Sequence, residues 1–364
     1  MMKCISEIAH RRSALLASAI ALAGAQSAFA DSAYLQHNLV FDGVATNFTA
    51  DHADANLVNA WGLTFGPGSP AWVANNGSST STVYDGDGNG PFLTVTVTGQ
   101  DPTGIVWNGS SRVSGAHFIF ATESGTVDAW TGGGATTSMP GSPGAVYKGI
   151  ALSGDGSALK LYVTDFANGA VDVFDGTFKL LPPSGNAFKD SKLPAGYNPF
   201  GIQAINGNIY VTFAKTQPGS TDEAHGSGTG FVDVFDPAGN LLHRIASKGV
   251  LNAPWGLTLA PAGFGQFSGA LLVGNFGDGT INAFDAVHGG YIGTLRGADH
   301  KAVKIDGLWG LAFGDGAHDQ PVNTLFFTAG PNDESDGLYG RLDVQPGSGN
   351  GNGNGQGDDN NDQG

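Results

Sequence analysis

Cysteine is nearly absent from this sequence. Its 364 residues include one cysteine, Cys4, which lies in an N-terminal segment with the features of a signal peptide. Once that segment is removed, the chain has no thiol and no disulfide. A cysteine nucleophile and a disulfide framework are therefore excluded, and stability must come from the core and from hydrogen bonds.

Basic residues are also scarce. The chain has 16 Lys and Arg against 32 Asp and Glu, a net charge of −16, which becomes −18 without residues 1–30. A protein this acidic is a poor partner for nucleic acid or for an anionic membrane surface, so neither is expected to bind. The simplest role of the charge is to keep the protein soluble.

The common catalytic motifs are missing as well. The sequence has no G-x-S-x-G, no H-E-x-x-H and no phosphate-binding P-loop. The eight histidines beyond residue 30 are scattered singly and do not have the spacing of metal ligands. A hydrolase that sequence motifs alone would identify is therefore not indicated.

The only long apolar run, at residues 14–25, is too short and too rich in alanine to span a bilayer. Basic residues precede it, and Ala28-Phe29-Ala30 supplies the small residues that a signal peptidase requires. These features predict a signal peptide at 1–30, export to the periplasm or the cell exterior, and no membrane span after cleavage. At the other end, residues 346–364 are rich in Gly, Asn and Asp and are predicted to be disordered.

Glycine is abundant, with 59 residues, and it marks a repeat in the segment 31–345. A glycine at the start of a short strand recurs at intervals of 42 to 55 residues. A second strand follows each time, and in all but the last copy a third strand ends the recognisable pattern. Repeats of this size predict an all-β, six-bladed β-propeller with four antiparallel strands in each blade. The six glycines are Gly62, Gly104, Gly149, Gly201, Gly256 and Gly310.

The last repeat is short, because too few residues follow Gly310 to supply four strands. The segment 35–44, LQHNLVFDGV, reads as a strand without a partner near the start of the chain. We therefore expect it to supply the outer strand of the last blade, which closes the ring and removes two exposed sheet edges.

Two sets of residues are predicted to meet at one face of the ring. The first precedes the strand-opening glycines and is mostly aromatic, which suits a sugar or another flat ligand, with a lysine for a carboxylate or phosphate. The alternative is that these rings only pack between blades, which their repetition favours. Thr103 completes this set, whose predicted ligand-binding residues are Trp61, Lys148, Phe200, Trp255 and Trp309.

The second set stands at the ends of the second strands. Its oxygen-bearing members, Asn75, Glu123, Asp165 and Asn275, form a candidate Ca²⁺ site, although each side chain can instead cap its own turn. No other cofactor is indicated. The acidic turn at 332–337 lies at the same face, where a solvated turn is the simpler interpretation.

The strand pattern resembles NHL-type repeats. The stretches 252–257, 269–279, 305–311 and 327–332 resemble a family of uncharacterised exported bacterial propellers, some of which carry a PEP-CTERM sorting tag that this chain lacks. The resemblance covers most of the chain and implies no established activity. A more distant resemblance links it to calcium-dependent lactonases of the SMP-30 and gluconolactonase type, but the positions of their metal ligands hold Trp61, Lys148 and similar residues here.

These patterns lead to three hypotheses about function. The first is an exported propeller that binds a small molecule, a glycan or an envelope protein at its channel face. The second is a calcium-assisted, lactonase-like hydrolase or lyase that uses Glu123 and Asp165. The third is a scaffolding role without a ligand.

Overall fold

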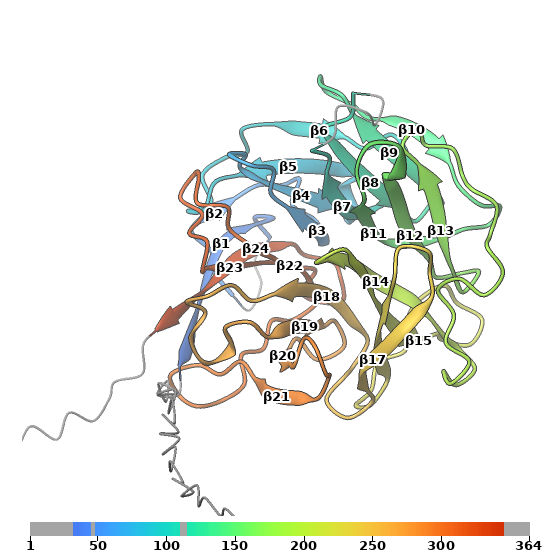
Figure 1. The fold of residues 1–364 in the computed structure, drawn as a ribbon. Coiled ribbons are helices and arrows are strands. Elements are labelled where there is room, and N and C mark those ends of the chain that lie inside the picture. The colour runs from blue at the N-terminus through green and yellow to red at the C-terminus, as the bar shows by residue number, and fades with distance from the viewer. Residues whose placement is uncertain (1–31, 45–47, 110–114, 346–364) are drawn as a thin grey trace, which may run out of the picture.

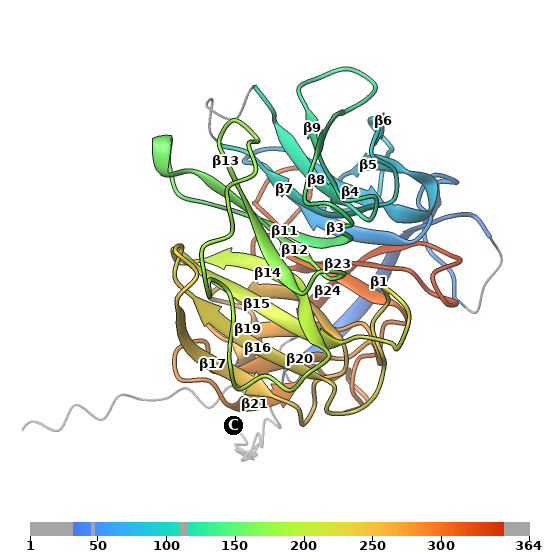
Figure 2. The ribbon, with the colours of Figure 1, turned by 90° about the vertical axis from the view of Figure 1, so that its right-hand side faces the viewer.

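Six small β-sheets stand around a common axis and form a six-bladed β-propeller (Figures 1 and 2). The computed structural model describes residues 32–44, 48–109 and 115–345. The predicted fold is therefore confirmed. The predicted signal peptide and C-terminal tail lie outside the described residues, and the domain boundaries drawn from them stay predictions.

The strands follow the ring in chain order. Blade 1 contains β3 (Ala60–Thr64), β4 (Ala71–Asn75), β5 (Thr80–Tyr84) and β6 (Thr94–Thr96). Blade 2 contains β7 (Pro102–Trp107), β8 (Phe118–Thr122), β9 (Thr126–Trp130) and β10 (Thr137–Pro140). Blade 3 contains β11 (Tyr147–Ser153), β12 (Lys160–Asp165) and β13 (Ala170–Asp175).

Blade 4 contains β14 (Tyr197–Ile205), β15 (Asn208–Lys215), β16 (Gly230–Phe235) and β17 (Leu241–Ser247). Blade 5 contains β18 (Pro254–Leu259), β19 (Leu271–Asn275), β20 (Ile281–Phe284) and β21 (Tyr291–Thr294). Blade 6 contains β22 (Leu308–Phe313), β23 (Leu325–Ala329), β24 (Leu338–Gln345) and, from the start of the chain, β1 (Ala33–Phe41) and β2 (His52–Ala53). Three short 3₁₀ turns complete the described elements: η1 (Asn76–Ser78), η2 (Gly156–Ala158) and η3 (Gly265–Phe267).

The strand-opening glycines allow neighbouring blades to approach closely at the axis. A Cβ added at Gly62 would lie 2.5 Å from the carbonyl oxygen of Thr103 in the next blade. A Cβ added at Gly256 would likewise lie 2.5 Å from the carbonyl oxygen of Trp309. Real Cβ atoms do not come this close to backbone, so only glycine fits where the innermost strands crowd together.

Threonine hydroxyls on second strands bond to the innermost strand of the next blade. The Thr164 hydroxyl in blade 3 donates to the carbonyl oxygen of Phe200 in blade 4, at 2.6 Å. The Thr328 hydroxyl in blade 6 makes the equivalent bond to Trp61 in blade 1, at 2.5 Å. The link between the last and the first blade is therefore built like the links between consecutive blades, and it helps to close the ring.

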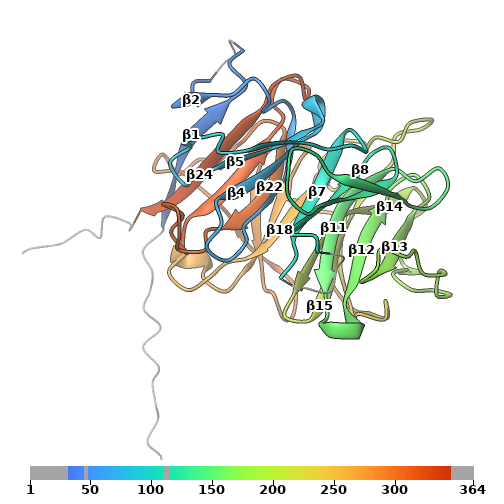
Figure 3. The same ribbon diagram turned by 90° about the horizontal axis from the view of Figure 1, so that it is seen from above.

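The closing strand lies where the sequence places it. β1 pairs antiparallel with β24, with Ala33 opposite Gln345 and Phe41 opposite Leu338, so it forms an outer strand of blade 6 (Figure 3). β2 then adds to the outer edge of β1 in parallel. The expectation that the start of the chain completes the last blade is confirmed.

Blade 3 departs from the expected four strands, because its sheet contains only three. After β13 the chain returns with one bridge, Phe174 to Leu180, and one hydrogen bond from the Leu181 N–H to the Val173 carbonyl. Pro182 and Pro183 follow at once. Since proline has no N–H to donate to a ladder, a fourth strand cannot continue through them.

Each pair of adjacent blades encloses its own apolar core. Between blades 1 and 2, for example, Trp72 and Val83 pack with Ile105 and Phe118, and the other five interfaces are filled in the same way. A seventh cluster lies on the axis itself. In the part of the chain that the structure describes, no helix is long and apolar enough to cross a bilayer.

Candidate functional site at the channel mouth

Aromatic side chains close the channel at the face where the innermost strands begin. Trp61, Trp255 and Trp309 come from blades 1, 5 and 6 and meet on the axis. The rings of Trp61 and Trp309 stack with centroids 3.5 Å apart, and Phe276 stacks on the other face of Trp309 at 3.8 Å. Trp255 meets both other tryptophans edge to face. We call this group, with Phe200 and Phe166, the aromatic plug.

The structure shows where the six residues that precede the strand-opening glycines lie. All six of them are buried. The aromatic members fill neither an open channel nor a gap between adjacent blades; they contact one another across the axis. Below them, five of the six strand-opening glycines line a cavity of only about 40 Å³. The plug therefore closes the channel at this end, and binding of a ligand by its residues stays a prediction.

Polar atoms tie the plug to the blades around it. The Trp255 indole N–H donates to the carbonyl oxygen of Lys148, 3.1 Å away on blade 3, and the Trp309 N–H donates to Asn59 Oδ1 at 3.2 Å. The Trp61 N–H is buried and has no acceptor among the described residues. An unpaired buried donor is costly, so this atom marks a place where a ligand or a water would be favoured.

Lys148 lies directly above the plug and is 2% exposed. Its ammonium group lies 5.0 Å from the centre of the Trp61 ring and 2.5 Å from Glu123 Oε1. Burial alone lowers the pKa of Lys148, but the charges of Glu123 and Glu223 outweigh it and raise the pKa above its usual value. Lys148 is therefore a cation at neutral pH, and an anionic ligand would have to displace Glu123 to reach it.

A chain of hydrogen bonds crosses the mouth from Lys148 to blade 6. The carboxylate of Glu123 accepts from the amide of Asn76 at 2.9 Å. Asn59 then donates both to Asn76, at 3.3 Å, and to Glu334 Oε2, at 2.7 Å. Burial raises the pKa of Glu334, the bond from Asn59 opposes this, and the charge of Glu223 raises it further. Asn76, Glu123 and Glu334 come from the turns between the second and third strands of blades 1, 2 and 6, whereas Asn59 directly precedes the first strand of blade 1.

The long loop between β15 and β16 adds a histidine and a third glutamate. Glu223 is buried, and its carboxylate lies 3.6 Å from the imidazole of His225, whose side chain is 49% exposed. The hydrogen bond with Glu223 raises the pKa of His225 above its usual 6.5. The His225 ring also packs edge to face on Phe276 of the plug, with centroids 5.0 Å apart. The loop therefore brings an acid–base pair to the same mouth.

The four predicted calcium ligands lie at this face, but three of them serve their own turns. Asn75 donates to Thr82, Asp165 accepts two bonds from Asn168, and Asn275 donates to Asp278 and Thr280. The fourth, Glu123, pairs with Lys148. Among the described residues, no group of three or more His, Cys, Asp or Glu side chains is arranged to hold a metal. A calcium site built from these four side chains stays a prediction.

Sequence reasoning expected its two sets of residues at one face of the ring, but it did not predict several other side chains at the channel mouth. It did not single out Asn59, Asn76, Glu223 or His225, and it took the turn that contains Glu334 for a solvated one. One signal was present: residues 216–229, between β15 and β16, form a much longer connection than the equivalent turns in blades 1, 2, 3 and 5. An insertion at the rim of a propeller is a common source of binding residues.

The chain matches two curated proteins along most of its length. Uncharacterized protein R648 of Acanthamoeba polyphaga mimivirus is 34% identical over 318 residues, which cover 80% of this chain and 76% of the relative. Uncharacterized protein L690 of the same virus is 32% identical over 324 residues, which cover 81% and 83%. This chain belongs to the family of R648 and L690. A scan of protein-family models gives no match.

The names of R648 and L690 state no activity for their family. The relatives are viral, so the comparisons do not support the expected bacterial exported family, although they agree that the family is uncharacterised. Among solved structures, a protein of unknown function from Bacteroides thetaiotaomicron has a TM-score of 0.55 at 13% identity, covering 86% of this chain and 76% of that one. A glucose dehydrogenase has a TM-score of 0.52 at 12% identity, covering 80% and 98%. At such identities, the likeness shows the fold alone.

The pair of His225 and Glu223 makes stability depend on pH. Because the pKa of His225 is raised in the folded protein, its stabilising contribution is complete below about 6.5 and is lost as the pH rises through the folded pKa. Because His225 is half exposed, water screens its interaction with Glu223, and the contribution to the free energy of unfolding is less than about 1 kcal/mol. We expect Glu223→Gln to return the His225 titration, followed by NMR, towards 6.5. An unchanged titration in this variant would show that Glu223 does not control the histidine.

Proposed function

We propose that this protein binds a glycan or another polyhydroxylated small molecule at the mouth of its channel. The observation that supports this is the convergence of Glu123, Glu223 and Glu334 around a single buried cation, Lys148, above the aromatic plug. Carboxylate oxygens accept hydrogen bonds from the hydroxyl groups of a sugar, and the faces of aromatic rings pack against its C–H groups. The excess of carboxylates disfavours an anionic ligand.

Binding at this mouth is measurable through the tryptophans. Three of the six tryptophans of the chain lie in the aromatic plug, and the Lys148 ammonium lies over Trp61. A ligand that rearranges the Glu123–Lys148 pair is expected to change tryptophan fluorescence. A panel of neutral oligosaccharides, tested by fluorescence and by calorimetry, should contain a binder, and Glu334→Gln should weaken its binding about tenfold through loss of a charged acceptor.

Asp315→Asn is the matched control for this experiment, because Asp315 pairs with the Gly68 N–H at the opposite end of the channel. It removes one carboxylate charge without touching the mouth, so affinity should not change. Equal weakening by both variants would point to a general charge effect. Absence of heat and of fluorescence change with every oligosaccharide would refute glycan binding.

A hydrolase or lyase is the second candidate, favoured by the acid–base groups at the mouth. The pKa of the Glu334 carboxyl and the pKa of the His225 imidazole are both raised, and such shifted groups are common in active sites. In the calcium-assisted form of this proposal, the carboxylate of Glu123 supplies an oxygen ligand to Ca²⁺. Turnover of a lactone that is abolished by EDTA, restored by Ca²⁺ and lost in Glu123→Gln would support it; turnover indifferent to EDTA would remove the metal.

We also propose that the protein acts after export, on the strength of the N-terminal sequence pattern and the acidic composition. Cleavage after Ala30 would produce a chain that begins at Asp31, immediately before the described part of blade 6. Mass spectrometry of the protein recovered from a secreting host tests this. An intact Met1 in the recovered protein would contradict it.

A further inference from the structure

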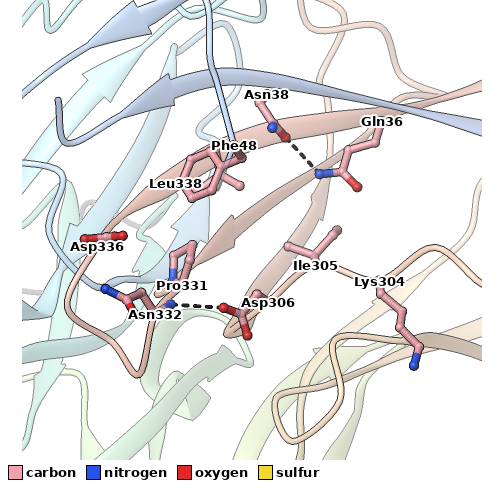
Figure 4. A pocket seen from close by; sticks show the side chains of 10 residues that line it. All are labelled: Gln36, Asn38, Phe48, Lys304, Ile305, Asp306, Pro331, Asn332, Asp336 and Leu338. Carbon is pink, nitrogen blue, oxygen red and sulfur yellow. Dashed lines mark hydrogen bonds between the residues drawn. The ribbon is translucent and has the colours of Figure 1, made fainter. Parts of the chain in front are cut away.

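A second cavity lies away from the channel, between blades 5 and 6. It has a volume of about 620 Å³, and its walls come from β1, β24, the connection between the two blades and the turn between β23 and β24 (Figure 4). That turn separates it from the channel mouth, since Glu334 bonds to Asn59 at the mouth whereas Asp336 lines the cavity. A space of this size is typical of small-molecule sites.

Asp336 is the unusual member of the lining. It is 2% exposed, and its Oδ2 atom has no hydrogen-bond partner among the described residues. Burial raises the pKa of its carboxyl, and the charge of Asp42 raises it further. Asp42 is buried as well, and its own Oδ2 atom also lacks a described partner. Each of these two buried carboxyl groups therefore raises the energy of the other's charged form, and no described cationic side chain forms an ion pair with either.

The rest of the lining does not neutralise Asp336. Asp306 accepts a hydrogen bond from the Asn332 N–H at 3.0 Å and adds further negative charge. Lys304 lies on the opposite side of the cavity from Asp336, and its ammonium group points away from it (Figure 4). Ile305 and Leu338 form an apolar wall between them. A buried carboxylate without a partner is costly, and a cation bound in the cavity would relieve this cost.

The geometry favours an organic cation over a metal ion. Calcium takes about six to eight oxygen ligands, and no cluster of three acidic or histidine side chains is found in the described chain. The cavity is also much larger than an ion requires, and part of its wall is apolar. We propose that it binds a small organic amine, with the ammonium group on Asp336 and the apolar body against Ile305 and Leu338.

The test compares 2-phenylethylamine with its neutral analogue 2-phenylethanol, by calorimetry and ligand-observed NMR on the intact protein at pH 7.5. Both probes offer the same apolar body, but only the amine is charged. We expect the amine to bind at least about tenfold more tightly, because the alcohol offers only a neutral donor to the carboxylate, whereas the ammonium group adds a charge-assisted bond. Binding of the amine should weaken as the pH falls and Asp336 becomes protonated.

Asp336→Asn keeps the shape of the side chain and removes its charge, so it should abolish the difference between the two probes. Because this variant removes an unpaired buried charge, it is expected to have a higher melting temperature than the wild type. A measured melting transition also shows that the variant is folded. Asp333→Asn, in the same turn but exposed and outside the cavity lining, is the matched control and should keep the difference.

Four results would overturn the proposal. Three of them are equal affinity for amine and alcohol, an unchanged preference in Asp336→Asn, and the absence of amine binding to the wild-type protein. The fourth is displacement of the amine by an equal concentration of CaCl₂, which would show a metal site. The comparison of the two probes on the wild-type protein does not depend on any variant.

Discussion

Deletion of residues 32–43 is expected to abolish the folded ring. This segment contains β1, which pairs with β24 at eight positions and buries Tyr34, Leu39 and Val40 in two different cores. The Tyr34 hydroxyl also donates to the carbonyl oxygen of Phe264 in blade 5, at 3.2 Å. Without β1, blade 6 would expose the edge of β24 and lose the contacts that fasten it to its neighbours.

Circular dichroism and size-exclusion chromatography measure this outcome. The truncated chain should lack a cooperative thermal transition near that of the intact protein and should aggregate through the exposed edge. Deletion of residues 346–364 is the control, because its composition predicts that it packs against nothing. A chain without β1 that melts like the intact protein would show that the ring closes without this strand.

Substitution of Trp309 by alanine is expected to have the largest effect of any single change in the plug. Its side chain is fully buried, stacks between Trp61 and Phe276, and donates to Asn59. Loss of a buried tryptophan costs about 3–5 kcal/mol, and here it also leaves the acceptor oxygen of Asn59 unpaired. Because the plug joins blades 1, 5 and 6, we expect the whole ring to unfold at a lower denaturant concentration than in the wild type.

Urea unfolding followed by circular dichroism gives the free energy directly. Trp107→Ala is the matched control, since Trp107 is 38% exposed at the opposite end of the channel and should cost much less. If both variants lose the same stability, the plug contributes nothing beyond ordinary side-chain burial. If Trp309→Ala is as stable as the wild type, the axial contacts are not needed to hold the blades.

The architecture was predictable because the physical cause of the repeat is local and recurs. Each innermost strand needs a glycine where it meets the next blade, so Gly62, Gly256 and their equivalents repeat at blade spacing. The closing strand could be inferred from the missing fourth strand after Gly310. The three-stranded sheet of blade 3 was not predicted, because the repeat suggested four strands and Pro182-Pro183 was not weighed against it.

The site was less predictable, because its residues come from turns whose side-chain directions depend on the assembled ring. The position before each glycine placed Trp61, Trp255 and Trp309 at one face of the ring, but it could not predict their mutual contacts on the axis. Glu223 and His225 belong to an insertion without counterparts in most of the other blades, so aligning the repeats could not reveal them. The sequence drew attention to the acidic turn 332–337 but not to Asp336 within it, since the lack of partners of Asp336 follows only from packing.

The register of β1 and β24 has a practical consequence for engineering. Ala33 lies opposite Gln345, whereas Phe41 lies opposite Leu338, next to the turn that carries Glu334. The two ends of the described ring therefore leave it side by side, at the edge remote from the channel mouth. A peptide linker between residues 345 and 33, with a new opening in a solvent-exposed loop, would give a circular permutant that retains the closing ladder. If either end of the described ring were attached to a surface, the channel mouth would face away from that surface.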